Sequence, residues 1–562
     1  MNYQISKQGR LIDIELAPNE MSSGGQGRIY KILSPYSLSD HCVKIYKDDH
    51  HALNNREKIE YMVMNKPENT DMNNIRICWP EFIVYNNQGK FSGYVMPLAF
   101  EGSRDLKIIE IHTIGKTLSQ KYPKFPEWHN KFELDSPIGF INRAKMLHNW
   151  ALAIEIIHRN GKFVIVDLKP ENVLATNTGK ISIVDTDSFQ INDGEKIFKG
   201  PVATPEYFAK FAKKRHKENL LQTQDCDCFA LAVSFYKILV GSHPYSGFKL
   251  LSPYDNDEFA DIASRIDAEL FVFGNKKAYI EQLQTNNMHK RFAKLPQQIQ
   301  SLFMTAFTSD SQPSAKIWKE ALKSVYSIGT RIRVPSLPRG NASINSECMC
   351  LCTLVIDVSG SMDICINTLN RALANFIEDL YSGSGGFKES SKDQVEVAIL
   401  QFDSECKIVR EPALVTKNER LPLLRVRGLK TNTSTAIRKA IEIIEERKYK
   451  YKSLGLSYYR PWIILLTDGN PNPYNKEDIE SLVKDVNLGI ENHKYMFTAI
   501  GIGTDVDKSF LNRISKGNYS FISHSNISSF FQTLSASISM NDGGDPQEDL
   551  LGTLNESIDL DI

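Results

Sequence analysis

The hydrophobic pattern in the second half of the chain predicts buried strands that alternate with amphipathic helices. Nearly continuous apolar runs occur at LCTLVID (351–357), VEVAILQF (395–402), WIILLTD (462–468) and FTAIGIG (497–503). Amphipathic stretches, such as 366–380 and 435–447, lie between these runs. Short apolar strands separated by helices are typical of a parallel sheet with helices on both faces. We therefore expect an α/β domain over residues 348–540.

The first half of the chain has a different pattern. Short strand signals continue to about residue 100, and mainly helical material follows, such as INRAKMLHNWALAIEIIHRNG at 141–161. Within that stretch Leu147, Ala151 and Ile154 share one helical face. A strand-rich lobe followed by a helical lobe predicts an α+β bilobal domain over residues 1–328, with a cleft between the lobes.

Two further segments lack apolar periodicity. GTRIRVPSLPRGNASINS combines Pro, Gly, Ser and Asn, which indicates a linker over residues 329–347. NDGGDPQEDLLGTLNESIDLDI contains seven acidic residues and no Lys or Arg. This composition predicts a disordered acidic tail over residues 541–562, so the chain as a whole is expected to be multidomain.

Composition and charge exclude several classes of protein. Of the 562 residues, 41% are apolar and 24% are charged, as in globular proteins that bury large cores. Lys+Arg and Asp+Glu both number 67, so no net field favours nucleic acid or an anionic membrane. The start of the chain lacks the apolar core of a signal peptide, and no apolar run is long enough to cross a membrane. We expect a cytoplasmic protein that binds neither nucleic acid nor membrane.

The nine cysteines favour a reducing compartment, because an odd number spread over a long chain does not suit a disulfide framework. They cluster at Cys226/Cys228 and at Cys348/Cys350/Cys352, without the CxxC spacing or nearby His of a zinc site. We therefore expect buried structural thiols at these positions.

A glycine-dense turn precedes a lysine and two aspartate-containing strings in the first domain. SSGGQGRIY (22–30) places Gly24, Gly25 and Gly27 where backbone amides can approach phosphates, although such a turn is also a plain hairpin. Lys44 follows in HCVKIY, and then come VDLKPENVL (166–174) and IVDTDSF (183–189). These strings resemble the protein-kinase superfamily over roughly residues 15–325. The resemblance implies an ATP site that includes the three glycines, with Mg²⁺ or Mn²⁺ in the cleft.

The resemblance also implies a role for each matching side chain. Lys44 would pair with the nucleotide phosphates, Asp167 would accept or orient the substrate hydroxyl, and Lys169 would neutralise the transferring phosphoryl group. Asn172 and Asp185 would hold the metal ion.

Three further positions follow from the resemblance. The acid that pairs with Lys44 is expected on the helical stretch NNREKIEYMVM, as Glu57 in preference to Glu60. Asp187 is either a second oxygen ligand or a solvated turn residue, and we favour the turn because Mg²⁺ keeps several waters. Asp227 in DCDCFALAV matches an aspartate that anchors a helix in the family, so we expect a structural role for it.

Departures from the family pattern motivate a second interpretation. Ile165 and Val166 stand where most kinases carry His-Arg, and Thr186 and Asp187 replace the Phe-Gly of DFG. Switching by activation-loop phosphorylation is therefore not expected here. The alternative is a nucleotide-sensing pseudokinase scaffold that gates protein binding by the second domain.

Oxygen-bearing side chains follow an apolar strand of the second domain. VIDVSGSM (355–362) carries Asp357, Ser359 and Ser361 at alternate spacing at the carboxyl end of a strand, where ligands collect in parallel sheets. With TNTST (431–435) and LLTDG (465–469), these residues resemble the metal-ion-dependent adhesion site (MIDAS) of Rossmann-like von Willebrand factor A (vWA) domains, over about residues 349–538.

The resemblance implies that a threonine and a second aspartate complete this site. The threonine is expected to be Thr435, with Thr433 as a close rival, and the aspartate is Asp468. The site would hold Mg²⁺ or another divalent cation with an open position that an Asp or Glu of a protein partner can fill.

Together the resemblances imply an ATP-dependent serine/threonine protein kinase whose vWA domain recruits a protein partner. The two domains resemble the kinase and vWA components of bacterial tellurite-resistance and stress-response systems. In those systems such proteins act beside a metal-dependent protein phosphatase. The basic run KFAKKRHK (210–217) favours acidic substrates, including the tail with Thr553 and Ser557. Transfer to something other than protein is a third possibility.

Overall fold

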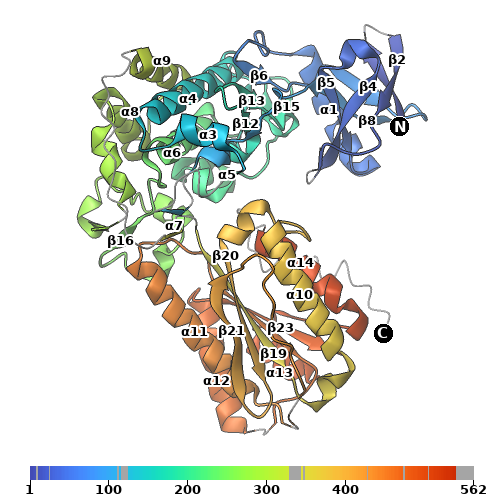
Figure 1. Ribbon diagram of the computed structural model, residues 1–562, viewed down its shortest axis with the longest axis vertical. Coiled ribbons are helices and arrows are strands. Elements are labelled where there is room, and N and C mark those ends of the chain that lie inside the picture. Colours follow the sequence, from blue (N-terminus) through green and yellow to red (C-terminus); the bar gives the residue numbers. More distant parts are fainter. Residues whose placement is uncertain are drawn as a thin grey trace. The chain divides into compact units, whose positions relative to one another are not determined.

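The computed structural model describes most of the chain as two compact units (Figure 1). The residues that it describes are 1–562 without 8–9, 24–25, 111–112, 115–123, 286, 328–343, 346–347, 427, 429, 473–474, 504–505 and 540–562. The first unit comprises Met1–Ile111, Lys116–Pro244 and Met288–Arg339. The second comprises His112–Gly115, Tyr245–Asn287 and Gly340–Ile562. The predicted acidic tail and most of the predicted linker lie outside the described residues, although Ile344–Asn345 forms strand β18, which pairs with β10 (Thr113–Ile114).

The first unit begins with an antiparallel sheet of seven strands in the order β2-β1-β7-β8-β5-β4-β3. The edge strand β2 also pairs with β4, which lies near the other edge of the sheet. Its core consists of alternating apolar side chains such as Ile5, Ile14 and Val95, all at most 2% exposed. The elements are β1 (Asn2–Lys7), β2 (Arg10–Leu16), β3 (Ser22–Ser23), β4 (Gly27–Ser34), β5 (His41–Tyr46), β7 (Phe82–Tyr85), β8 (Phe91–Pro97) and helix α1 (Asp49–Met64), which packs on β7 and β8.

The rest of the first unit is mainly helical, as expected from the sequence. Leu147, Ala151 and Ile154 are completely buried on one face of the long helix α4, which packs against α9 and α6. The helices are α3 (Pro126–Phe132), α4 (Pro137–His158), α5 (Lys210–Lys217), α6 (Gln224–Val240), α8 (Gln297–Thr308) and α9 (Ala315–Ser327). Short strands frame the loops between α4 and α5: β6 (Ile75–Ile77), β9 (Arg104–Asp105), β11 (Phe163–Val164), β12 (Val173–Ala175), β13 (Ile181–Ile183), β14 (Gln190–Asn192) and β15 (Ile197–Phe198).

The second unit contains the predicted α/β sheet. Six strands run in the order β21-β20-β19-β22-β23-β24, and all pair in parallel except the edge strand β21, which the sequence pattern did not predict. Neighbouring residues on β19 belong to different hydrophobic cores. Leu354 lies in the core that includes residues of α10 and α14, and Val355 lies in the core that includes residues of α11, α12 and α13. The helices lie on both faces of the sheet, as Figure 1 shows. The strands are β19 (Cys350–Asp357), β20 (Val395–Phe402), β21 (Cys406–Leu414), β22 (Trp462–Thr467), β23 (Met496–Ile502) and β24 (Tyr519–Ile522), and the helices are α10 (Ile366–Ser382), α11 (Thr433–Ser453), α12 (Lys476–Glu491), α13 (Lys508–Ile514) and α14 (Ile527–Ser539).

The segment Tyr245–Asn287 belongs to this second unit and packs against its α/β part. It carries β16 (Phe248–Leu250), α7 (Ile262–Asp267) and β17 (Ile280–Gln282). Its Ala260 packs in a small hydrophobic core of the second unit. The other members are Met349, just before β19, Tyr451 on α11, and Leu456 and Tyr458, which lie between α11 and β22. The domain limits of 1–328 and 348–540 stay predictions, and the structure adds that this segment, which lies within the first predicted range, belongs to the second unit.

The cysteines agree with the prediction of buried thiols. None of the nine forms a disulfide, and all are buried except the half-buried Cys406. Within the described part of the chain no three His, Cys, Asp or Glu side chains form a metal cluster. The described helices also include none with the length and apolarity needed to span a membrane.

Candidate functional sites

The loop that carries the predicted catalytic residues is held in place by Asp227 on α6. Asp227 is completely buried. Its carboxylate accepts hydrogen bonds from the backbone N of Ile165 and of Val166, both at 2.8 Å, and lies 2.9 Å from His158 Nε2. Val166 has φ +68°, a left-handed conformation that costs energy for a β-branched residue and has to be held by its surroundings. These contacts agree with the structural role predicted for Asp227 and show that it holds the backbone just before Asp167.

Asp167, Lys169 and Asn172 converge in this loop. Lys169 Nζ lies 3.0 Å from Asp167 Oδ2, and Asn172 Nδ2 donates to Asp167 O at 2.9 Å. Thr204, a residue missed in the sequence, joins them: its N and Oγ1 donate to Asp167 Oδ1 at 2.9 and 2.7 Å. Lys169 Nζ in turn donates to Thr204 Oγ1 at 2.6 Å. Thr204 lies in the string ATPEY (203–207), which does not itself indicate a contact with Asp167, 37 positions earlier.

Lys44 on β5 is bound to the 3-10 turn Thr186–Ser188 that follows β13. Its Nζ donates to both carboxylate oxygens of Asp187 at 2.8 Å and lies 3.6 Å from Asp185 Oδ1. Tyr46 OH also donates to Asp187, at 3.2 Å. Burial raises the pKa of Asp187, but the charge and hydrogen bonds of Lys44, with smaller contributions from Tyr94 and Lys58, together keep this pKa below its ordinary value. Lys44 and Asp187 therefore form a buried, charged pair.

This pair corrects two expectations. Glu57 does not pair with Lys44, because its side chain is 69% exposed on α1 and lies 3.0 Å from Lys196 Nζ. Glu60 forms an ion pair within α1 instead. Asp187 is not a solvated turn residue, because its side chain is only 1% exposed. The acid beside Lys44 thus comes from the turn after β13 and not from the helix.

The predicted metal and phosphate residues of the cleft are placed in part. Asp185 has φ +55° and a side chain that is 51% exposed, so its carboxylate is open to solvent. Gly24 and Gly25 lie outside the described residues. Gly27 begins β4, where a Cβ would lie 2.6 Å from Ile45 O, so glycine allows the close approach of β4 to β5.

In the second unit, oxygen atoms gather where β19 and β22 end. Asp357 is completely buried, and its carboxylate accepts from Ser359 N at 2.8 Å and from Thr467 Oγ1 at 2.6 Å. Ser359 Oγ lies 3.3 Å from Ser361 Oγ, which donates to Asp468 Oδ1 at 2.8 Å. Burial raises the pKa of Asp357 to about 6 and also raises the pKa of Asp468. The structure thus brings the four predicted Asp and Ser residues together.

Thr431, which was not one of the two predicted candidates, directs its hydroxyl toward Gly469 beside Asp357. A Cβ atom added to Gly469 would lie 3.5 Å from Thr431 Oγ1 and 3.9 Å from Asp357 Oδ2. Both side chains therefore face Gly469. Thr435 is exposed in the first turn of α11, and its hydroxyl donates to the side chain that caps this helix at 3.0 Å. Thr433 is buried and donates to Thr431 O at 3.4 Å. The buried spacing along α11 does not determine where residues of the preceding loop point, and Thr431 was missed for that reason.

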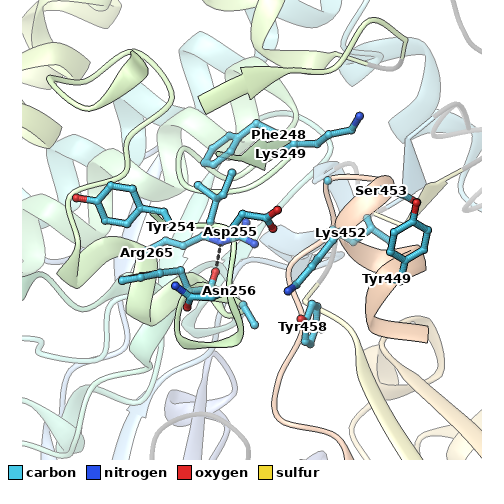
Figure 2. Close-up of a pocket in the computed structure, with 15 residues that line it drawn as sticks. Phe248, Lys249, Tyr254, Asp255, Asn256, Arg265, Tyr449, Lys452, Ser453 and Tyr458 are labelled. Carbon is cyan, nitrogen blue, oxygen red and sulfur yellow. Dashed lines mark hydrogen bonds between the residues drawn. The ribbon is translucent and has the colours of Figure 1, made fainter. Parts of the chain in front are cut away.

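A cavity of about 240 Å³ also lies in the second unit, between the segment Tyr245–Asn287 and the end of α11 (Figure 2). Aromatic and charged side chains line it together. Arg265 donates to Phe259 O at 2.7 Å and to Ser457 Oγ at 2.9 Å, and Lys452 lies 3.2 Å from Asp257. Because these two cations already have partners in the fold, we assign no ligand to the cavity.

Comparison with known proteins finds two domain families. The protein kinase domain profile matches residues 123–314, and the von Willebrand factor type A domain profile matches residues 353–536. Protein kinase YegI of Escherichia coli (strain K12) is 24% identical over 318 residues, which cover 54% of this chain and 44% of YegI. Citron rho-interacting kinase of Rattus norvegicus is 35% identical over 98 residues, which cover 17% of this chain and 5% of that protein. The chain thus spans less than half the length of these relatives.

A solved structure titled "ROP18 kinase domain in complex with AMP-PNP and sucrose" is 15% identical, with a TM-score of 0.38, and covers 58% of this chain and 84% of that chain. The two profile ranges contain the Asp167 and Asp357 clusters, whereas Lys44 and Tyr46 precede the kinase range. Asp167 and Thr204 lie in the first range, and Asp357, Thr431 and Asp468 lie in the second. The chain therefore carries a protein kinase domain followed by a von Willebrand factor type A domain.

Proposed function

We propose that the chain is an ATP-dependent serine/threonine protein kinase whose vWA domain recruits a protein partner through a divalent metal ion. The observation that carries the kinase part is the convergence of Lys169, Asn172 and Thr204 on Asp167. Phosphoryl transfer depends mainly on positioning and on neutralisation of charge, and this cluster provides a carboxylate and an ammonium group held next to each other.

The residues in the cleft fit ATP with Mg²⁺ or Mn²⁺. Asp185 offers a half-exposed carboxylate, and Asn172 directs its amide NH₂ to Asp167, which leaves its amide oxygen for a cation. Both are oxygen donors of the kind that these hard cations prefer. A bound cation would supply positive charge to the phosphates. Lys44 would supply a second positive charge, because its ammonium group is held beside Asp185 by Asp187.

In this proposal Asp167 orients the substrate. A serine or threonine hydroxyl that donates to the Asp167 carboxylate would be directed toward the γ-phosphate. Lys169, 3.0 Å from that carboxylate, would stabilise the negative charge of the transferring group. Asp227 would contribute indirectly, because it fixes the backbone just before Asp167.

The vWA site fits a divalent cation for a similar reason. Hydroxyl and carboxylate oxygens of Asp357, Ser359, Ser361, Thr431 and Asp468 gather at one sheet edge, and such oxygens suit Mg²⁺. A cation bound there would offer an open position to an Asp or Glu of a partner. Such recruitment would raise the concentration of the partner near the kinase domain.

The test is incubation of the full chain and a generic acceptor protein with γ-labelled ATP and Mg²⁺. We expect label on protein with the wild type and with Asp357→Ala, and none with Asp167→Ala. Asp310→Ala, an exposed aspartate of the kinase domain, is the matched control and should keep full transfer. Absence of label with the wild type, despite measurable ATP binding, contradicts kinase activity.

One observation favours a second candidate, the nucleotide-sensing pseudokinase scaffold. Asp167 Oδ1 already accepts two hydrogen bonds from Thr204, so a substrate hydroxyl has to compete with the chain's own threonine. In the scaffold, ATP would bind without transfer of its phosphoryl group. Its binding would change how much protein partner the vWA domain binds. Partner capture measured with and without ATP, in a preparation that shows no transfer, distinguishes this function from the first.

Other parts of the proposal rest mainly on the sequence. The basic run Lys210–Lys217 forms helix α5, in which Ala212 is the only buried side chain, and this composition favours acidic substrates. The acidic tail with Thr553 and Ser557, one such candidate, lies outside the described residues. Mapping of phosphosites after incubation with ATP tests it. A metal-dependent phosphatase as partner, a cytoplasmic location and a role in stress response stay predictions.

A further inference from the structure

Helix α1 directs a lysine, not an acid, toward Lys44. The glutamates of this helix, Glu57 and Glu60, have side chains that are 69% and 37% exposed. Between them Lys58 is only 7% exposed, on the face of α1 that packs against β5 and the turn Thr186–Ser188. Lys58 therefore occupies the inward face from which an acid was expected.

The ammonium group of Lys58 lacks a partner of its own. Among the residues that the structure describes, it makes no hydrogen bond and no ion pair, whereas Lys44 takes both oxygens of Asp187. Burial lowers the pKa of Lys58 to about 8, the charge of Asp187 opposes this shift, and the charge of Lys44 adds to it. A buried lysine without a hydrogen-bonded anion is unfavourable, so its presence here indicates a functional constraint.

The local charges favour an anion beside Lys58. Two ammonium groups, Lys44 and Lys58, lie near one buried carboxylate, Asp187, and one half-exposed carboxylate, Asp185. If Asp185 holds a cation, as proposed above, its charge is no longer available to the lysines. The remaining three groups then carry one excess positive charge at the point where nucleotide phosphates are expected.

We propose that Lys58 is a second phosphate-binding residue, which contacts the bound nucleotide and so fixes α1 against it. This inference rests on the proposed nucleotide site but not on phosphoryl transfer. In this arrangement Asp187 positions Lys44, and the nucleotide itself supplies the anion for Lys58. The position of α1 would then depend on whether a nucleotide is bound.

The test is calorimetric binding of adenosine, ADP and ATP, the nucleotides with Mg²⁺, to the full chain and its variants. We expect Lys58→Met to weaken ADP and ATP binding by about tenfold to a hundredfold, since a charged hydrogen bond is lost, and to leave adenosine binding unchanged. Lys58→Arg, which keeps the charge, should recover part of the loss. Arg56→Met, on the exposed side of the same helix, should bind all three ligands like the wild type.

The outcomes are distinct. Equal binding of ADP and ATP by Lys58→Met and the wild type overturns the inference. Equal loss for adenosine and ADP also overturns it, because it indicates a structural role. A wild type that binds no nucleotide overturns both this inference and the proposed function. Binding that depends on Lys58 in a protein that transfers no phosphate supports the inference while the kinase proposal fails.

Discussion

Replacement of Asp187 by asparagine tests which acid holds Lys44. In the structure the Asp187 side chain is 1% exposed and accepts both hydrogen bonds from Lys44. Removing one partner of a buried ion pair costs about 3–5 kcal/mol, because the other charge stays buried. The Glu57–Lys196 pair has side chains that are 69% and 47% exposed, and such pairs contribute about 0–1 kcal/mol. We therefore expect Asp187→Asn to lower the free energy of unfolding by at least 2 kcal/mol more than Glu57→Gln.

The assay is urea unfolding followed by tryptophan fluorescence, together with ATP binding. Four of the five tryptophans, Trp79, Trp128, Trp150 and Trp318, are buried in the first unit, so the signal reports mainly on that unit. Asp187→Asn should lower both stability and ATP affinity, and Glu57→Gln should change neither measurably. A Glu57→Gln variant that loses ATP binding while Asp187→Asn retains it would refute our assignment of the acid.

Three shorter predictions concern other contacts. Asp227→Ala removes two hydrogen bonds that hold the loop at Val166, so it should destabilise the chain by roughly 2–5 kcal/mol in urea unfolding and abolish any transfer. Gly93→Ala places a Cβ 1.9 Å from Lys44 O, which should cost about 1–3 kcal/mol or more and weaken ATP binding in the same assays. Mg²⁺ should raise the unfolding temperature of the vWA domain, and EDTA or Asp357→Ala should remove this effect; equal stabilisation of Asp357→Ala would place the cation elsewhere.

The sequence predicted the sites better where strand ends position the side chains. Asp357 ends β19 and Asp468 follows the adjacent parallel strand β22, so the topology brings them to the same end of the sheet. Thr431 lies in a loop before a helix, where spacing along the helix carries no information about side-chain direction. The same limit applied to α1, where periodicity did not settle which face is buried and Lys58 was missed.

Tertiary contacts decided the remaining differences. Asp187 is a short acidic residue in a turn, a pattern that is usually solvated, and it is buried here because Lys44 and Tyr46 bind it. From the sequence, Val166 was interpreted only as the residue that stands where most kinases carry an arginine. Its left-handed backbone is held by Asp227, more than 60 residues later in the chain, and no local pattern predicts such a contact.

The segment Tyr245–Asn287 provides a last prediction, because its contacts with α11 depend on one carboxylate. Asp257 lies 3.0 Å from Lys448 Nζ and 3.2 Å from Lys452 Nζ, and it accepts from Tyr458 OH at 3.1 Å. The Lys448 side chain is only 3% exposed, so Asp257→Ala leaves a buried ammonium group with a single, half-exposed glutamate as partner. We expect this change to loosen the segment by about 2–4 kcal/mol.

Native-state hydrogen exchange on the full chain measures this effect locally. A loss of 2–4 kcal/mol should speed exchange by roughly 30-fold to 1,000-fold in peptides from 245–287 and 448–458, because local opening sets their rates. Asp255→Ala, an exposed neighbour in the same segment, is the matched control and should leave these rates unchanged. Unchanged exchange in Asp257→Ala would mean that the segment does not pack on the vWA domain in solution. Faster exchange in Asp257→Ala, but not in Asp255→Ala, would mean that residues before the predicted linker are part of the fold of the second unit. A protein truncated to begin at residue 348 would then lack part of the core of that unit.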